Sequence, residues 1–430
     1  MAVIDDRRGD LATAADTSDE REVFERRESR VRSYCRIYDV VFDRAAGSHL
    51  YAEDGRAYID FLAGCSTLNY GHDHPVARAA LIEYLQRGGV AHGLDLHTVA
   101  KREFLETFER LILEPRGLDH IVQFTGPTGT NAVDAAMKLA RMATGRRNIV
   151  SFTNAFHGVT SGVLAATGNA SQRLDAWLTH TDTTRWTFDG YGSTGIEQLD
   201  LLDTLLRDGS GGIAPPAAFL VETVQGEGGL NVASAEWMQR LERIAHEHGA
   251  VLIVDDVQAG CGRTGTFFSF EPLGVTPDIV TVSKSISGYG LPMAMVLIRP
   301  ALDQWAPAQH NGTFRGNSHA FVTATAVLDH FWSDARFERE ISRKAELLSE
   351  LLDLIGRQLP GSQRRGRGMF QGLDVGCGGL AEAVCRRAFE LGLIIETCGP
   401  DGEVLKVLAP LTTDDATLRR GCELLAEALA

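Results

Sequence analysis

The pattern of hydrophobic positions changes along the chain. Between residues 120 and 298, short β-branched runs bounded by polar residues predict strands at 120–125, 148–152, 217–224, 251–254, 278–283 and 294–298. Segments with helical periodicity lie between several of them, at 131–143 and 234–248. Strands that alternate with helices predict a mostly parallel sheet covered on both faces, and catalytic groups in such sheets collect at the carboxyl ends of the strands.

The flanking regions show other patterns. Residues 1–20 are polar and aperiodic, which predicts a flexible arm, and the charged stretch 20–36 predicts a helix. Residues 50–61 place Asp54-Gly55 between two extended segments, as in a hairpin. After residue 307 the pattern predicts helices at 321–332 and 343–359, then short strands. We therefore expect a large domain at 61–310 and a smaller C-terminal α/β domain at 311–430, joined by the N-terminal segment 21–60.

Composition and charge narrow the class of protein. Hydrophobic residues make up 44% and charged residues 23%, as in ordinary globular proteins, and the net charge of -15 argues against a nucleic-acid partner. No apolar run approaches the roughly 18 residues of a membrane helix, and the first residues carry no secretory signal. The seven cysteines form no CxxC pair, and the GHDHP and HEH histidines have no third ligand at metal-site spacing. These features predict a cytoplasmic protein without a metal site.

The most informative residues follow two of the predicted strands. The first run reads VLIVDDVQAGCGRTG and the second DIVTVSK, so the strands deliver Asp255, Asp256 and Lys284 to their carboxyl ends. A partly desolvated lysine has a lowered pKa and can act as an amine nucleophile, while a buried carboxylate can keep a pyridine nitrogen protonated, as pyridoxal-phosphate (PLP) chemistry requires. The spacing alone leaves open that these are ordinary solvated charges at strand ends.

These runs resemble the cofactor core of the class III (ω-type) aminotransferases, roughly D-E-V-Q-x-G-x-G-R-T-G followed by P-D-x-x-x-x-x-K. The resemblance implies the PLP-dependent transferase fold type I, with a mostly parallel seven-stranded sheet between helices and a smaller α/β domain. It implies that Lys284 is the catalytic, Schiff-base lysine, that Asp255 pairs with the pyridinium nitrogen, and that Gln258 lies near the phenolic oxygen of the cofactor. Asp256 stands where the family usually has Glu.

Three further segments match the cofactor contacts of this family. In TGPTGTNAVD, a Gly-rich turn before a helix, the matching residues Gly129 and Thr130 are expected to bind the phosphate. The turn NAFHG matches an aromatic-His-Gly turn, which places Phe156 on the pyridine ring and His157 beside the cofactor. In HNGTFRGN, Thr313 matches a threonine that reaches the phosphate of a neighbouring subunit, so the resemblance implies a homodimer, or a larger homo-oligomer, with shared active sites.

Two more residues are expected on the substrate side. In ETVQGEGG, Glu227 matches a glutamate that pairs with an active-site arginine and releases it to bind the carboxylate of glutamate or 2-oxoglutarate. The arginine position is taken by Lys406, in LKVLAPL. A lysine attracts a carboxylate as a point charge, without the bidentate fork of arginine.

Several stretches match one branch of the family more closely, among them LNYGHDHP, HGLDLHTVAK, QFTGPTGTNAV and SKSISGYGLPM. This branch interconverts L-2,4-diaminobutyrate and 2-oxoglutarate with L-aspartate 4-semialdehyde and L-glutamate in ectoine biosynthesis, and the resemblance implies that reaction. The alternatives are an ω-aminotransferase for ornithine, 4-aminobutyrate or lysine, and a supply of diaminobutyrate for siderophores or peptides. A racemase or mutase of the same fold, and a PLP-binding regulator, are more distant alternatives.

Overall fold

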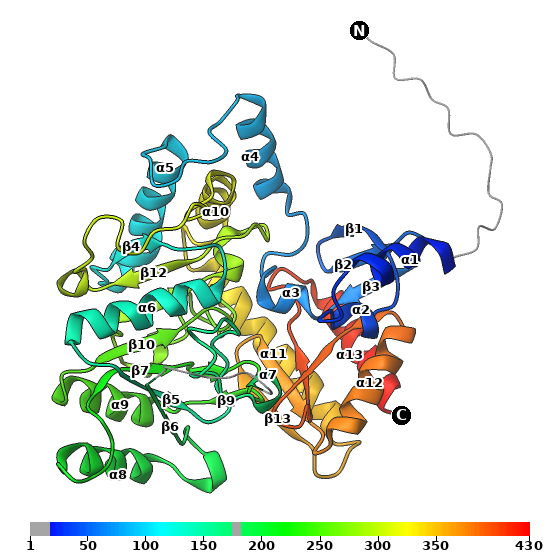
Figure 1. The fold of residues 1–430 in the computed structure, drawn as a ribbon. Helices are drawn as coiled ribbons and strands as arrows, with labels where there is room; N and C mark the ends of the chain where they lie inside the picture. Colours follow the sequence, from blue (N-terminus) through cyan, green and yellow to red (C-terminus); the bar gives the residue numbers. More distant parts are fainter. Residues whose placement is uncertain (1–17, 174–181) are drawn as a thin grey trace.

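A seven-stranded sheet forms the centre of the computed structural model, which describes residues 18–173 and 182–430 (Figure 1). Its strands are, in spatial order, β4 (Ile121–Phe124), β12 (Met295–Ile298), β11 (Ile279–Val282), β10 (Val251–Asp255), β7 (Pro216–Val221), β5 (Asn148–Phe152) and β6 (Thr183–Trp186). Only β12 runs antiparallel to its neighbours in this sheet. The predicted α/β fold with a mostly parallel seven-stranded sheet is confirmed.

Both faces of this sheet are buried, which is why its strands read as unbroken apolar runs. Along β10, Leu252 and Val254 face one core, where α9 (Ala235–Glu247) packs through Trp237. Ile253 faces a second core on the other side, filled by the alanine-rich face of α6 (Gly129–Thr144). Helices on both faces leave the carboxyl ends of the parallel strands as the edge where polar side chains gather.

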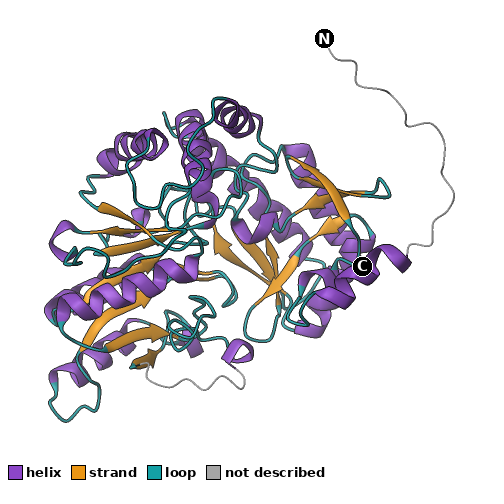
Figure 2. Ribbon diagram, turned by 45° about the horizontal axis from the view of Figure 1, so that its top comes forward, coloured by secondary structure: helices purple, strands orange, loops and turns teal. Residues whose placement is uncertain are grey.

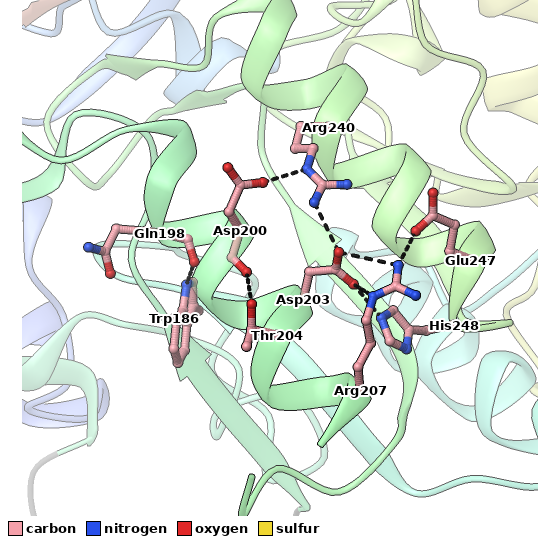
Figure 3. Close-up of polar contacts among 9 residues, drawn as sticks. All are labelled: Trp186, Gln198, Asp200, Asp203, Thr204, Arg207, Arg240, Glu247 and His248. Atoms are coloured by element: carbon pink, nitrogen blue, oxygen red, sulfur yellow. Dashed lines mark hydrogen bonds and ion pairs between the residues drawn. The ribbon is translucent and has the colours of Figure 1, made fainter. Parts of the chain in front are cut away.

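A charged network joins α9 to α8 (Ile196–Arg207), as Figure 3 shows. The buried Asp203 accepts hydrogen bonds from Arg207 Nε (2.9 Å) and Arg240 Nη2 (3.0 Å), and its Oδ1 lies 2.8 Å from Nε2 of His248. Burial alone would raise the pKa of Asp203, but these partners together lower it. The network fixes two surface helices relative to each other, and it gives His248 a structural role.

Two smaller sheets lie beside the central one (Figures 1 and 2). The first contains β1 (Phe42–Ala46), β2 (His49–Ala52) and β3 (Ala57–Asp60), with β15 (Leu393–Ile394) added parallel to β3. The second contains β13 (Gln363–Arg367), β14 (Phe370–Asp374), β17 (Val404–Val407) and β16 (Glu396–Cys398), all antiparallel. The expected hairpin around Asp54-Gly55 is present as β2 and β3. The N-terminal segment and the C-terminal region thus share a sheet.

The remaining helices surround these sheets. Near the top of Figure 1, α10 packs against α4 and α5. The helices α11, α12 and α13 pack beside the two smaller sheets. Their bounds are α4 (Pro75–Gln86), α5 (Val99–Phe108), α7 (Ala170–Arg173), α10 (Ser318–Phe331), α11 (Arg336–Gly356), α12 (Gly378–Glu390) and α13 (Asp415–Leu429). No helix within the described ranges combines the length and the apolarity needed to cross a membrane.

The prediction of one continuous helix at 20–36 was wrong. The structure has α1 (Ser18–Arg27), a break, and α2 (Tyr34–Ile37). In the break, the hydroxyl of Ser29 accepts a hydrogen bond from the backbone N–H of Val31, and this local contact competes with helix formation. The arm predicted at 1–20 falls mostly on residues 1–17, which lie outside the described part of the chain, and α1 begins at Ser18.

Candidate active site

A cavity of about 250 Å³ lies where β10 and β11 end. Its lining residues are Gly129, Thr130, Phe156, His157, Gly158, Val159, Glu222, Asp255, Val257, Gln258 and Lys284. Every residue that the sequence predicts for cofactor binding lies on this cavity, except Thr313. A larger cavity of about 440 Å³ contains Arg364 and Arg365, but both are ion-paired and no lysine among the described residues lines it. The smaller cavity is therefore the candidate active site.

Asp255, the last residue of β10, is a buried carboxylate on the cavity wall. Its Oδ2 lies 2.7 Å from Nδ1 of His157, and its Oδ1 accepts hydrogen bonds from Thr281 Oγ1 (3.0 Å) and the Val257 N–H (3.2 Å). Contacts to both oxygens fix the orientation of the carboxylate. Such a carboxylate fits the protonated pyridine nitrogen of PLP.

Lys284 begins a 3-10 turn (Lys284–Ser287) directly after β11. Its φ of 54° is in the left-handed region, which costs a non-glycine residue roughly 1–2 kcal/mol. The next residue holds this geometry, because Ser285 Oγ donates to the carbonyl of Ser66 (2.6 Å) and accepts from the N–H of Asn69 (3.0 Å). Burial lowers the pKa of Lys284, which favours the uncharged, nucleophilic amine.

The first turn of α6 fits a phosphate group. Gly129 and Thr130 start the helix at the cavity, and no side chain caps its first N–H groups. Such N–H groups, together with the positive end of the helix dipole, form an anion site. The turn that carries Gly158 packs so closely here that a Cβ at this position would lie 2.3 Å from Thr130 Oγ1. An amine, a buried carboxylate and an anion cradle on one cavity match the chemical groups of PLP.

Glu222, which follows β7, is a cavity residue that the sequence prediction missed. Its carboxylate accepts hydrogen bonds from the N–H groups of Phe156 (2.8 Å) and Gly226 (3.2 Å). Burial raises its pKa to about 7. The position of Glu222 at a strand end was an available signal, identical to the one that identified Asp255. Glu222 connects the turn of Phe156 with the segment that carries Glu227.

An ion-pair triad lies behind Gln258. Lys406, on β17, is fully buried, and its Nζ lies 2.7 Å from Oε1 of Glu227 and 2.9 Å from Oε1 of Glu396. Gln258 Nε2 donates to Glu227 Oε1 (3.1 Å) and so connects the triad to the cavity. Burial opposes the charge of Lys406, but the carboxylates of Glu227 and Glu396 raise its pKa well above the usual value. The predicted pair of Glu227 and Lys406 is thus present as a contact, and their roles toward substrate stay predictions.

Glu396 was missed because the sequence prediction did not include the pairing of β16 with β17. β16 pairs with β17 so that Glu396 lies directly opposite Lys406. The Glu-Thr-Cys run of β16 carries no apolar pattern that would have revealed this register.

A left-handed turn, Ala63–Ser66, forms another wall of the triad, with φ values of 45°, 58°, 55° and 70°. Asp60 Oδ1 holds its start by accepting two backbone N–H groups, and Gln258 Nε2 donates to the carbonyl of Cys65 (3.3 Å). The thiol of Cys65 lies 2.9 Å from the hydroxyl of Tyr34. An unusual backbone of this kind is maintained only where surrounding contacts determine it, and it is concentrated at functional sites.

Thr313 lies outside the cavity of its own chain. It is exposed, and so is Phe314, whose ring contacts His92. Arg315 forms an ion pair with Asp95. Within the described residues, no group of three or more His, Cys, Asp or Glu side chains is arranged to hold a metal ion.

Comparisons with known proteins point to one family. The family described as aminotransferase class-III matches residues 32–429. The diaminobutyrate–2-oxoglutarate transaminase of Halomonas elongata is 54% identical over 409 residues, covering 94% of this chain and 97% of the relative. The enzyme of the same name from Vibrio parahaemolyticus is 52% identical over 410 residues, with 95% and 97% covered.

Solved structures agree on the fold. A Bacillus anthracis aminotransferase superposes with a TM-score of 0.84 at 23% identity, covering 97% of this chain and 99% of the other. The Toxoplasma gondii ornithine aminotransferase, whose description mentions PLP at the active site, gives a TM-score of 0.81 at 24% identity, with 96% and 94% covered.

Proposed function

Because the chain belongs to the class-III aminotransferases, a PLP-dependent family, we propose that it interconverts L-2,4-diaminobutyrate and 2-oxoglutarate with L-aspartate 4-semialdehyde and L-glutamate. The observation that carries the proposal is identity above 50% with diaminobutyrate–2-oxoglutarate transaminases over nearly the full length of both chains. The reaction requires one nucleophilic amine, one anion cradle and one group that attracts a carboxylate. Lys284 and the start of α6 supply the first two at the cavity, and Lys406, behind Gln258, is proposed as the third. Ectoine biosynthesis in the cytoplasm is the proposed setting, and the seven free cysteines suit a reducing compartment.

Each cavity residue has a distinct task in this proposal. PLP, when bound, supplies the electron sink of transamination. Lys284 Nζ bonds covalently to the cofactor at rest, and as the free amine it takes the proton from the amine-bearing carbon of the substrate. Asp255, held by His157, keeps a proton on the ring nitrogen. The start of α6, with Gly129 and Thr130, holds the phosphate.

Glu227 and Lys406 are proposed to serve the second substrate. Glu227 forms an ion pair with the Lys406 ammonium when a diamine is bound. It moves away when the carboxylate of glutamate or 2-oxoglutarate binds to Lys406 instead. Glu227 lies in the turn between β8 (Val224–Gln225) and β9 (Asn231–Val232), and its side chain is 27% exposed, so it can move more readily than the buried Lys406.

A homodimer is proposed to complete the phosphate site. Thr313 and Phe314 are exposed, and the nearby segment presents further exposed apolar side chains, Val90, Leu94 and Leu96. Contiguous exposed apolar surface is typical of subunit interfaces. Mixing Lys284→Ala and Thr313→Glu chains tests the sharing of sites, because a hybrid dimer would contain one site with both native residues. Regained activity is the expected result, and a mixture as inactive as its components would contradict shared sites.

The substrate assignment is tested by a donor screen. Diaminobutyrate, ornithine, 4-aminobutyrate and lysine are each offered with 2-oxoglutarate, and glutamate formation is followed. Diaminobutyrate is expected to give the highest kcat/KM. Equal or faster turnover of ornithine or 4-aminobutyrate would assign the chain to another ω-aminotransferase activity. Racemisation without 2-oxoglutarate consumption would indicate a racemase.

A further inference from the structure

Lys406 forms ion pairs with two carboxylates, although one carboxylate is enough to neutralise its charge. Glu227 and Glu396 both lie within 3 Å of Nζ, at 2.7 and 2.9 Å. Lys406 is fully buried and Glu396 is 7% exposed, so with both carboxylates ionised the three groups carry one excess negative charge, and burial raises the pKa of Glu396 because that charge is costly. Burying a charge without a counter-ion is costly. A cationic ligand in the adjacent cavity would supply the missing positive charge.

Glu396 is the fixed member of this triad. It lies on β16, directly opposite Lys406 on β17, and its Oε2 accepts a hydrogen bond from the hydroxyl of Tyr34 (3.1 Å). Its Oε1 is buried and lies 2.9 Å from Nζ of Lys406, whose better-aligned hydrogen bond goes to Glu227. One ammonium shared by two carboxylates neutralises their combined charge only in part.

This triad adjoins the site of reaction. The carboxylates of Glu227 and Glu396 favour the charged form of the Lys284 amine and Lys406 opposes it, while burial lowers the pKa of Lys284 overall. Gln258, which lines the cavity, donates to Glu227, so a single side chain separates the triad from the cavity. The side chains in direct contact with Glu396 are Tyr34 of α2, Cys65 of the left-handed turn and Lys406. Glu227, Lys284, Cys385 and Cys398 also interact with its charge.

We propose that Glu396 determines substrate preference, because the charge it adds beside Lys406 favours cationic diamino donors over anionic dicarboxylates. The inference rests on the proposed function, since a diamino acid with two ammonium groups carries a net positive charge and glutamate a net negative one. In a partly buried site, removing one nearby unit charge changes the affinity for a singly charged ligand by roughly tenfold or more.

The test compares the PLP-loaded wild-type enzyme with Glu396→Gln, which keeps the shape and removes the charge. The KM for diaminobutyrate is expected to rise about tenfold. The Kd for glutarate, an unreactive dicarboxylate measured by calorimetry, is expected to fall by a similar factor. Glu396→Asp, which restores the charge, should return both constants toward the wild-type values. Glu403→Gln is the matched control, because Glu403 lies on the same hairpin and accepts a hydrogen bond only from the N–H of Asp401 among the described contacts.

Opposite changes for the cation and the anion are the decisive result. A shift of both constants in the same direction would show that Glu396 only supports the fold of the pocket, and no shift would also overturn the proposal. If Glu396→Gln does not fold, Glu227→Gln removes the other carboxylate and must shift the preference in the same direction. Ornithine and lysine carry the same net charge as diaminobutyrate, so the effect of Glu396 on cationic donors can be measured even if diaminobutyrate is a poor donor. The proposed role of Glu396 can therefore fail while the proposed reaction holds, and the reverse.

Discussion

An alanine at position 158 is expected to weaken cofactor binding while the chain still folds. Gly158 has a φ of 123°, a conformation that L-residues rarely adopt, and a Cβ there would lie 2.3 Å from Oγ1 and 2.5 Å from Cβ of Thr130. Contacts between a Cβ and another heavy atom are essentially never below 3.0 Å, so the turn and the start of α6 must separate by about 0.7 Å. Overpacking of this kind costs about 1–3 kcal/mol.

The same displacement determines the effect on PLP. A backbone N–H that donates to the phosphate at about 2.9 Å would move to roughly 3.6 Å, beyond hydrogen-bond range. Losing one such bond to a charged group costs about 1.5–3 kcal/mol, which raises the Kd for PLP by about ten- to two-hundredfold. Titrating the apoenzyme with PLP, followed by cofactor absorbance, measures this Kd.

Gly145→Ala provides the matched control. Gly145 ends the same helix with a φ of 66°, and a Cβ there has nothing within 4 Å, so the variant carries backbone strain without a clash. Thermal unfolding of both apoenzymes separates stability from affinity. If Gly158→Ala bound PLP as tightly as Gly145→Ala, the start of α6 would not be the phosphate cradle.

Three further outcomes are expected. Lys284→Ala should abolish transamination and the visible absorption band of PLP bonded to a lysine, and a surviving band would reassign the bonding lysine. Burial raises the pKa of Asp256 to about 7, so the folded state holds a proton there that the unfolded chain has already released above about pH 4. Between pH 4 and 8 the wild type should therefore lose up to about 4 kcal/mol of unfolding free energy relative to Asp256→Asn, as measured by denaturant unfolding. If the unfolding free energies of the two proteins changed with pH in parallel, the raised pKa of Asp256 would be refuted. Asp203→Asn should lower the free energy of unfolding by about 1–3 kcal/mol at pH 7. Because the pKa of Asp203 is lowered in the folded chain, the difference in stability between the wild type and the variant should shrink as the pH falls toward 3 and below. A difference that does not depend on pH would contradict the charge pairing.

The sequence predicts the central sheet well because its strands are buried on both faces. The prediction for β5, 148–152, matches the strand, since all five residues are buried. The seventh strand, β6, was not located from its pattern. It lies at the edge of the sheet, pairs only with β5, and its residues are half-buried, so Thr183–Trp186 carries no apolar run. β6 lacks the two-sided burial of β5, and the apolar run on which the prediction depends is missing from it.

The residues of the candidate site also fall into two groups, those that the sequence could predict and those that it could not. Asp255 and Lys284 could be predicted because each directly follows a buried strand, and the fold brings such positions together. Tyr34 and Glu396 could not be found by that rule, since they come from a short helix and a hairpin 362 residues apart in sequence. Only the folded chain places them in contact, and a charge pair across a hairpin depends on a register that composition does not specify.

The pairing of β3 with β15 has a consequence for synthesis on the ribosome. Ile59 pairs with Leu393, so the N-terminal sheet has an open edge until a strand more than 330 residues later is translated. At roughly 5–20 residues per second this takes about 17–67 s. During this interval, Ile59 and Asp60 lack the strand that later pairs with them, and the nascent chain exposes an unpaired strand to its neighbours. Chaperone binding to short ribosome-bound chains, and its loss once β15 has left the exit tunnel, is the expected signature in living cells.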